Sequence, residues 1–440
     1  MLPIVTPIVL LTLLFALDIA LSSRVRPRTP YAVRDSHVVP RKWTRFDELE
    51  RHLYEVSDPS HHRYGQHLTS AEVDELVKPS DDALELLHDW LLDNGIERRR
   101  LEYNSAKNWI KVTLSVQAVE GLLDTTYSIY KHEEGDYTVR TAQEIPDNAT
   151  QLDTGTDLKG NLDAETLIAI DYPTPLIAFT TGGSPPFDPS ASTTTDTNEP
   201  YLTWLNYALA QPDLPQTISI SYGDDEQTVP YAYATLACQQ FAQLGAGGIT
   251  LLFASGDSGV GPTGACVSND GKTTTMFLPS FPASCPYVTT VGATRTSPLE
   301  SPPSIPLTIS PRGRGFSNYF PRPRVPGPGF RFLTVWDGGV VVLDGTSVST
   351  PTATRVVSLV NDTLLAAGRA PLGWLNPWLY GVGKGGVTDV VEGSATGCGG
   401  EGFPAEAGWD AVTGWSTPYF PKLVRLALEG VAGTGMGCRG

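Results

Sequence analysis

The pattern of apolar and polar positions changes about one third of the way along the chain. Before residue 150 it predicts a small α+β unit: Asp81–Asn94 has apolar residues at helical spacing, and Trp109–Leu114 alternates like a strand. We expect a second helix over Val116–Leu123. A turn-rich polar run over residues 146–160 follows and would suit proteolytic cleavage.

Beyond this run, predicted strands alternate with predicted helices. Apolar segments at Thr217–Ser221, Gly248–Ala254 and Tyr287–Val291 indicate buried strands, and Tyr231–Leu244 indicates a helix between the first two. This order is typical of a parallel sheet with covering helices, whose active site lies beyond the carboxyl ends of the strands. Residues Pro302–Gly339 are rich in proline, glycine and arginine and predict a loop.

Two short motifs in this later part could carry chemistry. Residues 345–351 read GTSVSTP and precede apolar residues at helical spacing, so we expect a helix from about Thr350 or Pro351 with Ser347 just ahead of it. Unpaired backbone N–H groups there favour developing negative charge. Asp257, in SGDSG after a predicted strand, would project into the same cleft. The alternatives are an ordinary helix cap and an ordinary turn residue.

The histidines are unevenly placed. All seven lie in the first third of the chain: His37, His52, His61, His62, His67, His88 and His132. A serine–histidine pair is therefore not expected in the later part, and a carboxylate is the remaining common proton acceptor for a serine hydroxyl. A carboxyl base stays ionised at acidic pH, where imidazole is already protonated.

Composition narrows the class of protein. The chain has 440 residues, of which 40% are hydrophobic and 18% are charged, so it can form a large core. Its formal net charge of -17 argues against nucleic acid or an anionic membrane as a partner. It fits a protein that stays soluble in acid, and it fits an ordinary acidic secreted protein nearly as well.

The N-terminus predicts export. Ile8–Leu17 is apolar except for Thr12 and is followed by small residues, so residues 1–23 are expected to be a secretory signal peptide of an extracellular protein. The start lacks a basic residue and Asp18 is present, so an uncleaved anchor is the alternative. No other stretch is long and apolar enough to be a stable membrane anchor. Secretion makes two glycosylation sequons meaningful, at Asn148 and Asn361, so a glycoprotein is expected.

The five cysteines have no metal-ligand spacing. In an oxidising compartment we expect Cys266 with Cys285 and Cys398 with Cys438 as disulfides. Cys238 would then be a buried thiol on an apolar helix face.

Several motifs together resemble the sedolisin family of serine-carboxyl peptidases, and within it the fungal tripeptidyl-peptidase-like members. They are Ser57–Pro59, Tyr64–Leu68, Asn161–Asp163, Ser221–Glu226, Ser255–Gly259, Gly345–Ser347, Gly408–Asp410 and Thr413–Gly414. The resemblance implies an α/β fold in which a ferredoxin-like α+β prosegment, here residues 24–150, precedes a subtilisin-like parallel-sheet peptidase domain, residues 151–440. It also implies peptide or protein substrates and inhibition by the chain's own prosegment until acid activation.

Residue by residue, the resemblance implies three catalytic positions. Ser347 matches the nucleophile, Asp163 the aspartate that supports the general base, and Asp257 the aspartate that hydrogen-bonds the oxyanion. Asp257 would have to be protonated to donate that bond, which again favours activity in acid.

The resemblance also implies one calcium ion near the C-terminus. The carboxylates of Asp389 and Asp410 would bind it together with the backbone carbonyls of Val390, Gly408 and Glu406. Oxygen ligands from a glycine-rich loop suit this hard cation.

The chain departs from the family pattern at the general base. Lys159 stands where a glutamate is expected, four residues before Asp163, and an ammonium group cannot accept a proton. Glu165 lies only two residues after Asp163, on roughly the opposite side of a helix. Compared with members of the family, the chain is also short in two core segments. One precedes the expected helix that contains Asp163, and the other lies between Phe320 and Val341.

Two smaller departures are Asp344 before the serine motif and Ser416 after the calcium loop. Two hypotheses therefore stay open. The chain is an acid peptidase whose base is supplied from elsewhere, or it is a catalytically inactive relative that binds peptides. An incomplete gene model is a further explanation of the second.

The histidine distribution suggests a regulatory hypothesis. Buried prosegment histidines that dock on an acidic catalytic domain would become charged in acid and favour release, and His61, His62 and His67 are the residues to test. Exposed, solvated histidines are the alternative.

Overall fold

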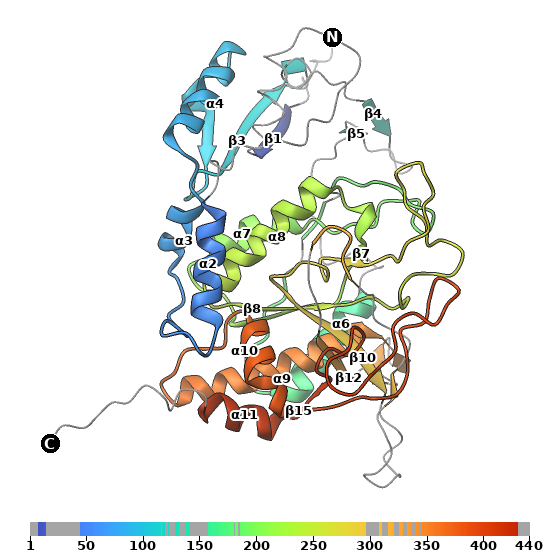
Figure 1. Ribbon diagram of the computed structural model, residues 1–440. Helices are drawn as coiled ribbons and strands as arrows, with labels where there is room; N and C mark the ends of the chain where they lie inside the picture. The colour runs from blue at the N-terminus through green and yellow to red at the C-terminus, as the bar shows by residue number, and fades with distance from the viewer. Residues whose placement is uncertain are drawn as a thin grey trace, which may run out of the picture. The chain divides into compact units, whose positions relative to one another are not determined.

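The computed structural model describes most of the chain and divides it into two compact units (Figure 1). The described residues are 8–14, 45–115, 117–118, 122, 128–131, 137–140, 157–179, 181–183, 185–295, 308–309, 316–320, 325–328, 332–336, 339–343 and 345–429. One unit comprises residues 1–50 and 69–145, and the other comprises residues 51–68 and 146–440.

The first unit is the predicted α+β unit. Its three-stranded antiparallel sheet has the order β1 (Ile8–Leu14), β3 (Trp109–Ser115), β2 (Leu101–Tyr103). Helices α3 (Ser70–Val77) and α4 (Asp81–Asp93) begin at caps made by Thr69 and Ser80, and the hairpin of β4 (Ser128–Lys131) and β5 (Tyr137–Arg140) follows. The expected helix over 116–123 lies mostly outside the described residues. Strand β1 is part of the run assigned to a signal peptide, whose cleavage stays a prediction.

Residues 51–68 belong by their contacts to the second unit, although the sequence places them in the prosegment. They include most of α2 (Phe46–Ser57), whose Leu53 and Val56 are fully buried. The ring of Tyr54 packs edge-on against Trp374, with 4.8 Å between centroids. The backbone N–H of Leu68 donates to the carbonyl of Ala246 at 2.9 Å.

The second unit is built on a parallel sheet. Strands β6 (Thr217–Ile220), β8 (Thr250–Ala254) and β10 (Thr289–Arg295) pair in parallel in that order, and β12 (Val325–Pro328) pairs in parallel with β10. Strand β11 (Thr308–Ile309) is antiparallel to β10. All five residues of β8 are buried, as expected for a central strand covered on both faces.

Helices cover both faces of this sheet (Figure 1). Helices α7 (Tyr201–Leu209) and α8 (Tyr231–Ala246) form one layer, with an aromatic core that includes Tyr201, Phe241, Phe253 and Phe281. The other layer contains α9 (Thr346–Ala366), against which α6 (Asp157–Asp171) packs. The shorter α10 (Leu375–Gly381) and α11 (Phe420–Glu429) complete the core under α9.

Three short antiparallel pairs complete the second unit. They are β7 (Asp224–Asp225) with β9 (Ser280–Phe281), β13 (Phe332–Trp336) with β14 (Gly339–Leu343), and β15 (Val387–Thr388) with β16 (Thr417–Pro418). The prediction that 302–339 is a loop is therefore wrong for β11, β12 and β13. Strand β12 contains two prolines, which an edge strand tolerates because its outer N–H groups have no ladder partner.

The disulfides differ from the expected pairing. Cys238 is bonded to Cys285, and Cys266 to Cys398. Both predicted pairs are wrong, because tertiary folding brings the loop after β8 to residues 395–400 rather than to the end of β9. The buried cysteine on α8 is thus a disulfide partner and not a thiol, and Cys438 lies outside the described residues.

Candidate functional site

Ser347 lies in the first turn of α9, which begins at Thr346 rather than near Thr350. Pro351 is therefore inside the helix, where its missing N–H leaves the carbonyl of Ser347 without its intrahelical donor. Ser221, just after β6, fills this position: its Oγ donates to the Ser347 carbonyl at 3.1 Å. The Oγ of Ser347 in turn donates to the carbonyl of Ser221, also at 3.1 Å. The serine is half-buried and held at the carboxyl end of the sheet.

Asp257 caps the same helix from the loop after β8. Its Oδ1 accepts hydrogen bonds from the backbone N–H of Thr346 at 2.8 Å and from the Thr346 hydroxyl at 3.2 Å. The backbone N–H of Gly256 donates to that hydroxyl at 3.2 Å. A carboxylate at a helix N-terminus is stabilised by the unpaired N–H groups. The structure thus brings Asp257 to the residue next to Ser347 and leaves its side chain exposed.

Asp163 is half-buried on α6, the helix that packs against the serine helix α9. Glu165 accepts a hydrogen bond from the Asn161 amide at 3.1 Å, one turn back along α6. The backbone of Lys159 belongs to α6, and its side chain lies outside the described part of the chain.

A buried ion pair joins these two helices. Arg355 of α9 donates to Asp171 Oδ2 of α6 at 2.8 Å, and the hydroxyl of Ser358 donates to the same oxygen at 2.9 Å. The side chains of Arg355 and Asp171 are only 6% and 4% exposed. Asp171 is eight residues after Asp163, and Arg355 is eight residues after Ser347. Neither residue of this pair belongs to a motif, so the sequence alone gives no signal for it.

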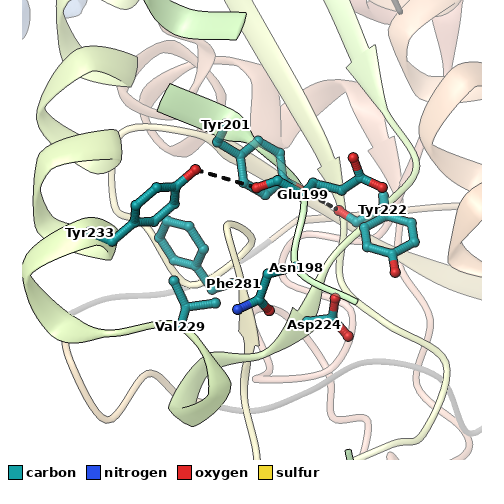
Figure 2. Close-up of a pocket in the computed structure, with 8 residues that line it drawn as sticks. All are labelled: Asn198, Glu199, Tyr201, Tyr222, Asp224, Val229, Tyr233 and Phe281. Atoms are coloured by element: carbon teal, nitrogen blue, oxygen red, sulfur yellow. Dashed lines mark hydrogen bonds between the residues drawn. The ribbon is translucent and has the colours of Figure 1, made fainter. Parts of the chain in front are cut away.

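A small, closely packed pocket includes Tyr222, the residue after Ser221 (Figure 2). It is lined by Asn198, Glu199, Tyr201, Tyr222, Asp224, Val229, Tyr233 and Phe281. The hydroxyl of Tyr201 donates to the Tyr222 carbonyl at 3.3 Å, and that of Tyr233 to the Glu199 carbonyl at 3.4 Å. Burial, followed by the charges of Asp224 and Glu199, raises the pKa of Tyr222, so its hydroxyl stays protonated.

Asp389 and Asp410 lie in one hydrogen-bonded loop region. Asp389 accepts from the Gly408 N–H at 2.8 Å and from the Ser416 hydroxyl at 3.2 Å. Asp410 accepts from the Thr413 hydroxyl at 2.6 Å, and the hydroxyls of Thr413 and Ser416 are 3.1 Å apart. The backbone N–H of Val390 donates to Ser416 Oγ at 3.0 Å. The hydroxyls of Thr413 and Ser416 thus connect the two carboxylates.

The chemistry of this donor set fits calcium. The side chains offer only oxygen ligands, and within the described residues no three His, Cys, Asp or Glu side chains gather as a metal group. The remaining ligands would have to be backbone carbonyls, which is the arrangement expected for Val390, Gly408 and Glu406. Several N–H and O–H donors now point at the carboxylates, so a bound cation would replace some of them.

The sequon at Asn361 is inside the protein. Asn361 lies on α9, is 2% exposed, and accepts a hydrogen bond from the Leu372 N–H at 2.9 Å. A glycan cannot be accommodated on this side chain in the folded state, so the prediction of a glycan here is wrong. Asn148 lies outside the described residues.

None of the described helices is long and apolar enough to cross a membrane.

These features together define a class of protein. A serine sits in the first turn of a helix, beside the carboxyl ends of parallel strands, with a carboxylate against the same turn. This is the arrangement of an α/β serine hydrolase, in which the helix N-terminus and neighbouring groups stabilise an oxyanion.

Comparisons with known proteins narrow the class to a family. Residues 40–153 match the model of the pro-kumamolisin activation domain. The chain is 38% identical over 330 residues to tripeptidyl-peptidase sed4 of Aspergillus fumigatus, a match that covers 62% of this chain and 54% of that protein. It is 29% identical over 540 residues to tripeptidyl-peptidase SED4 of Arthroderma otae, covering 87% and 88%. These matches support a tripeptidyl-peptidase-like protein that is similar to the sedolisin family of serine-carboxyl peptidases.

The same comparisons show how much of the relatives this chain contains. It spans about half the length of the Aspergillus relative that it matches. The alignment with the Arthroderma relative is longer than the whole chain, so that relative contains internal segments that this chain lacks. Among solved structures, Pseudomonas sedolisin (serine-carboxyl proteinase) complexed with two molecules of pseudo-iodotyrostatin matches with a TM-score of 0.46 and 18% identity, covering 86% of this chain and 97% of that one.

Proposed function

We propose that this chain is the secreted precursor of a peptidase that acts in acid and removes tripeptides from, or cleaves within, peptide substrates. The observation that carries the proposal is the position of Ser347, in the first turn of α9, with its Oγ 3.1 Å from the Ser221 carbonyl and Asp257 against the preceding residue. The fungal relatives named as tripeptidyl-peptidases support the tripeptidyl mode.

Each site residue has a role in this proposal. The Oγ of Ser347 attacks the substrate carbonyl while its proton passes to a carboxyl base, which must come from elsewhere in the chain because Lys159 stands four residues before Asp163, where that base is expected. The peptide C–N bond then breaks, the leaving amine takes up that proton, and the acyl-enzyme remains. Asp257 donates a hydrogen bond to the oxyanion. Because Asp257 Oδ1 accepts from Thr346, the donated proton would be on Oδ2. That step needs a protonated carboxyl group and therefore acid.

We place the amino-terminal part of the peptide at the tyrosine-rich cluster next to Ser221, whose side chains leave no room for a water molecule and would have to move apart to admit it. The cluster includes the residue after Ser221, and Glu199 and Asp224 give it a negative potential. A positively charged group, such as a free peptide amino terminus, would be favoured there. The neutral hydroxyl of Tyr222, whose pKa is raised, already donates to the Thr197 carbonyl at 2.9 Å, so it could accept a hydrogen bond from such a group without adding charge.

A second candidate function is peptide binding without catalysis. It is favoured by Lys159, which occupies the position expected for the general base, and by the internal segments that the Arthroderma relative has and this chain lacks. In this candidate the cleft and pocket remain, while proton transfer from Ser347 does not occur.

One experiment separates the two candidates. Hydrolysis of a fluorogenic tripeptide amide is measured at about pH 4 for the acid-treated chain, for Ser347→Ala, and for Lys159→Glu beside Lys159→Gln. Activity that disappears in Ser347→Ala supports the peptidase. General-base catalysis contributes about 10²–10⁴-fold, so Lys159→Glu should raise activity by that order if the base is missing, whereas Lys159→Gln should not. A folded chain inactive in every variant supports the binding protein.

Three further parts of the proposal follow from the loop regions and the N-terminus. The carboxylates of Asp389 and Asp410, with the carbonyls of Val390 and Gly408, bind one Ca²⁺ that stabilises the loop they share. The signal peptide directs secretion, and Asn148 is the remaining glycosylation position. The activation domain inhibits the mature part until it is removed in acid.

A further inference from the structure

The imidazole of His67 is inserted between two glycines of the catalytic part. A Cβ atom at Gly248 would lie 2.9 Å from Cγ and Cδ2 of the ring, and one at Gly373 would overlap Cε1. Both glycines have left-handed backbone conformations, with φ of +91° and +65°. Glycine is thus required twice over, by backbone conformation and by the space that the ring fills. We call the space between Gly248 and Gly373 the imidazole slot.

Hydrogen bonds fix the protonation state of the ring. Nε2 lies 2.9 Å from the carbonyl oxygen of Pro371, which can only accept, so Nε2 carries a proton. Nδ1 is buried and has no hydrogen-bond partner among the described residues. The ring in the slot is therefore the neutral tautomer with an unused acceptor. The adjacent Leu68 N–H donates to Ala246 at the end of α8, which attaches this segment to the same place.

The described elements that surround the ring offer no free carboxylate that would pair with an imidazolium ion. Helix α8 and strand β8 contain no charged residue, and residues 367–374 contain only Arg369, which donates to the carbonyls of Ala427 and Leu428. On the segment of His67 itself, Asp58 accepts from Ser60, and Arg63 donates to Glu55. A proton on Nδ1 would place a buried cation without a counter-ion in the slot.

We propose that the imidazole slot is the site through which the catalytic part holds its activation segment, and that neutral His67 makes this docking sensitive to acid. The inference rests on the proposed function only in treating residues 51–68 as part of a removable activation domain. Residues 40–153 match such a domain, and residues 51–68 nevertheless pack with the catalytic part. The slot would then be exposed once the segment leaves.

The direction of the pH effect follows from linkage. Burial lowers the pKa of docked His67, and the hydrogen bond to Pro371 opposes this only in part. The undocked residue has the ordinary value of about 6.5 and binds a proton more readily. Docking is therefore strongest above about pH 6.5 and weakens by up to tenfold per pH unit below it, until the docked pKa is reached.

Hydrogen–deuterium exchange of the Leu68 amide tests this in the full chain. The Ser347→Ala background prevents self-processing, so the exchange of the Leu68 amide does not depend on peptidase activity. The test therefore stays valid if the chain proves not to be a peptidase. After correction for intrinsic exchange, protection should fall as the pH is lowered from 6.5 to 4.5, by up to tenfold per pH unit. His67→Gln keeps an amide donor for Pro371 but cannot be protonated, so protection should persist to pH 4.5. His61→Gln and His62→Gln are matched controls that should behave like the parent.

A second variant tests the slot itself. Gly373→Ala fills the space of the ring, so the Leu68 amide should lose protection already at pH 7.5, while the amides of β8 stay protected and report an intact fold. Protection of Leu68 in Gly373→Ala would show that the slot does not hold the segment. The acid switch would be overturned if His67→Gln lost protection at the same pH as the parent, or if the parent kept full protection at pH 4.5.

Discussion

Ser221 supplies Ser347 with the hydrogen bond that a proline four residues later cannot give. The Oγ of Ser221 donates to the Ser347 carbonyl, and the Oγ of Ser347 donates back to the Ser221 carbonyl, both at 3.1 Å. The helix can therefore contain Pro351 without leaving the nucleophile's carbonyl unsatisfied. The exchange also ties the nucleophile to the end of β6.

Removing this hydroxyl should destabilise the start of α9. We expect Ser221→Ala to lower the free energy of unfolding by about 1–2 kcal/mol, because a carbonyl loses its donor. Ser219→Ala on the same strand is the matched control, since the Ser219 hydroxyl has no hydrogen-bond partner among the described residues. Adding Pro351→Ala to Ser221→Ala restores an N–H for that carbonyl, so the cost of Ser221→Ala should shrink in this background. Urea unfolding measures the parent, these three variants and Pro351→Ala alone, and equal costs of Ser221→Ala in both backgrounds would contradict this account.

Removing one member of the buried pair Arg355–Asp171 should lower the free energy of unfolding strongly, whereas replacing both members by apolar residues should lower it little. Arg355→Met or Asp171→Leu alone leaves a buried charge without its partner and should cost about 3–5 kcal/mol. The double variant should recover most of that loss, because no charge remains buried. Urea unfolding of the four proteins in a double-mutant cycle gives the coupling energy. Additive losses would show that the pair does not join α6 to α9.

Calcium should stabilise the C-terminal loops. Ca²⁺ at one hundred times its dissociation constant is expected to raise the free energy of unfolding by about 2.7 kcal/mol, and a chelator should reverse this. Asp389→Asn should abolish the response. Asp270→Asn is the control, because Asp270 lies in another loop, where it bonds to Ser268 and Lys272. A response that survives Asp389→Asn would place any calcium site elsewhere.

Asn361 should carry no glycan when the protein is secreted from a eukaryotic host. Its side chain accepts the Leu372 N–H from within the core, so a glycan would prevent α9 from packing. Mass spectrometry of the tryptic peptides, before and after enzymatic deglycosylation, gives the occupancy of this sequon. Substantial occupancy in folded protein would mean that α9 packs differently.

Much of the fold could be predicted because local pattern and tertiary packing agree. The buried run of β8 and the apolar face of α8 carry enough signal by themselves. Strand β12 does not: its prolines predict a loop, and only its place at the sheet edge makes a strand acceptable. Disulfide pairing failed for a similar reason, since spacing along the chain says little about which loops meet.

The motifs placed Ser347 and Asp257 against the same helix start, but the groups that hold them there have no local signal. In the sequence, Ser221 is only part of a motif. Its role as the donor to the Ser347 carbonyl follows from the helix start at Thr346 and from Pro351 inside α9. The sequon at Asn361 is a pattern that ignores burial, so it predicted a surface position that α9 does not provide. His67 was one of seven histidines until Gly248 and Gly373 were placed on either side of its ring.

The bond between Cys266 and Cys398 closes a covalent ring that contains Ser347 and every residue between the two cysteines. A protease that cuts the backbone once inside this ring, between the second disulfide's Cys285 and Cys398, opens the chain without releasing either piece. The product would migrate as one species without reductant and as two with it. In such a nicked form the loop after β8 and the loop before Asp410 would still belong to one covalently linked molecule. A single cleavage there would therefore not separate the two pieces of the protein.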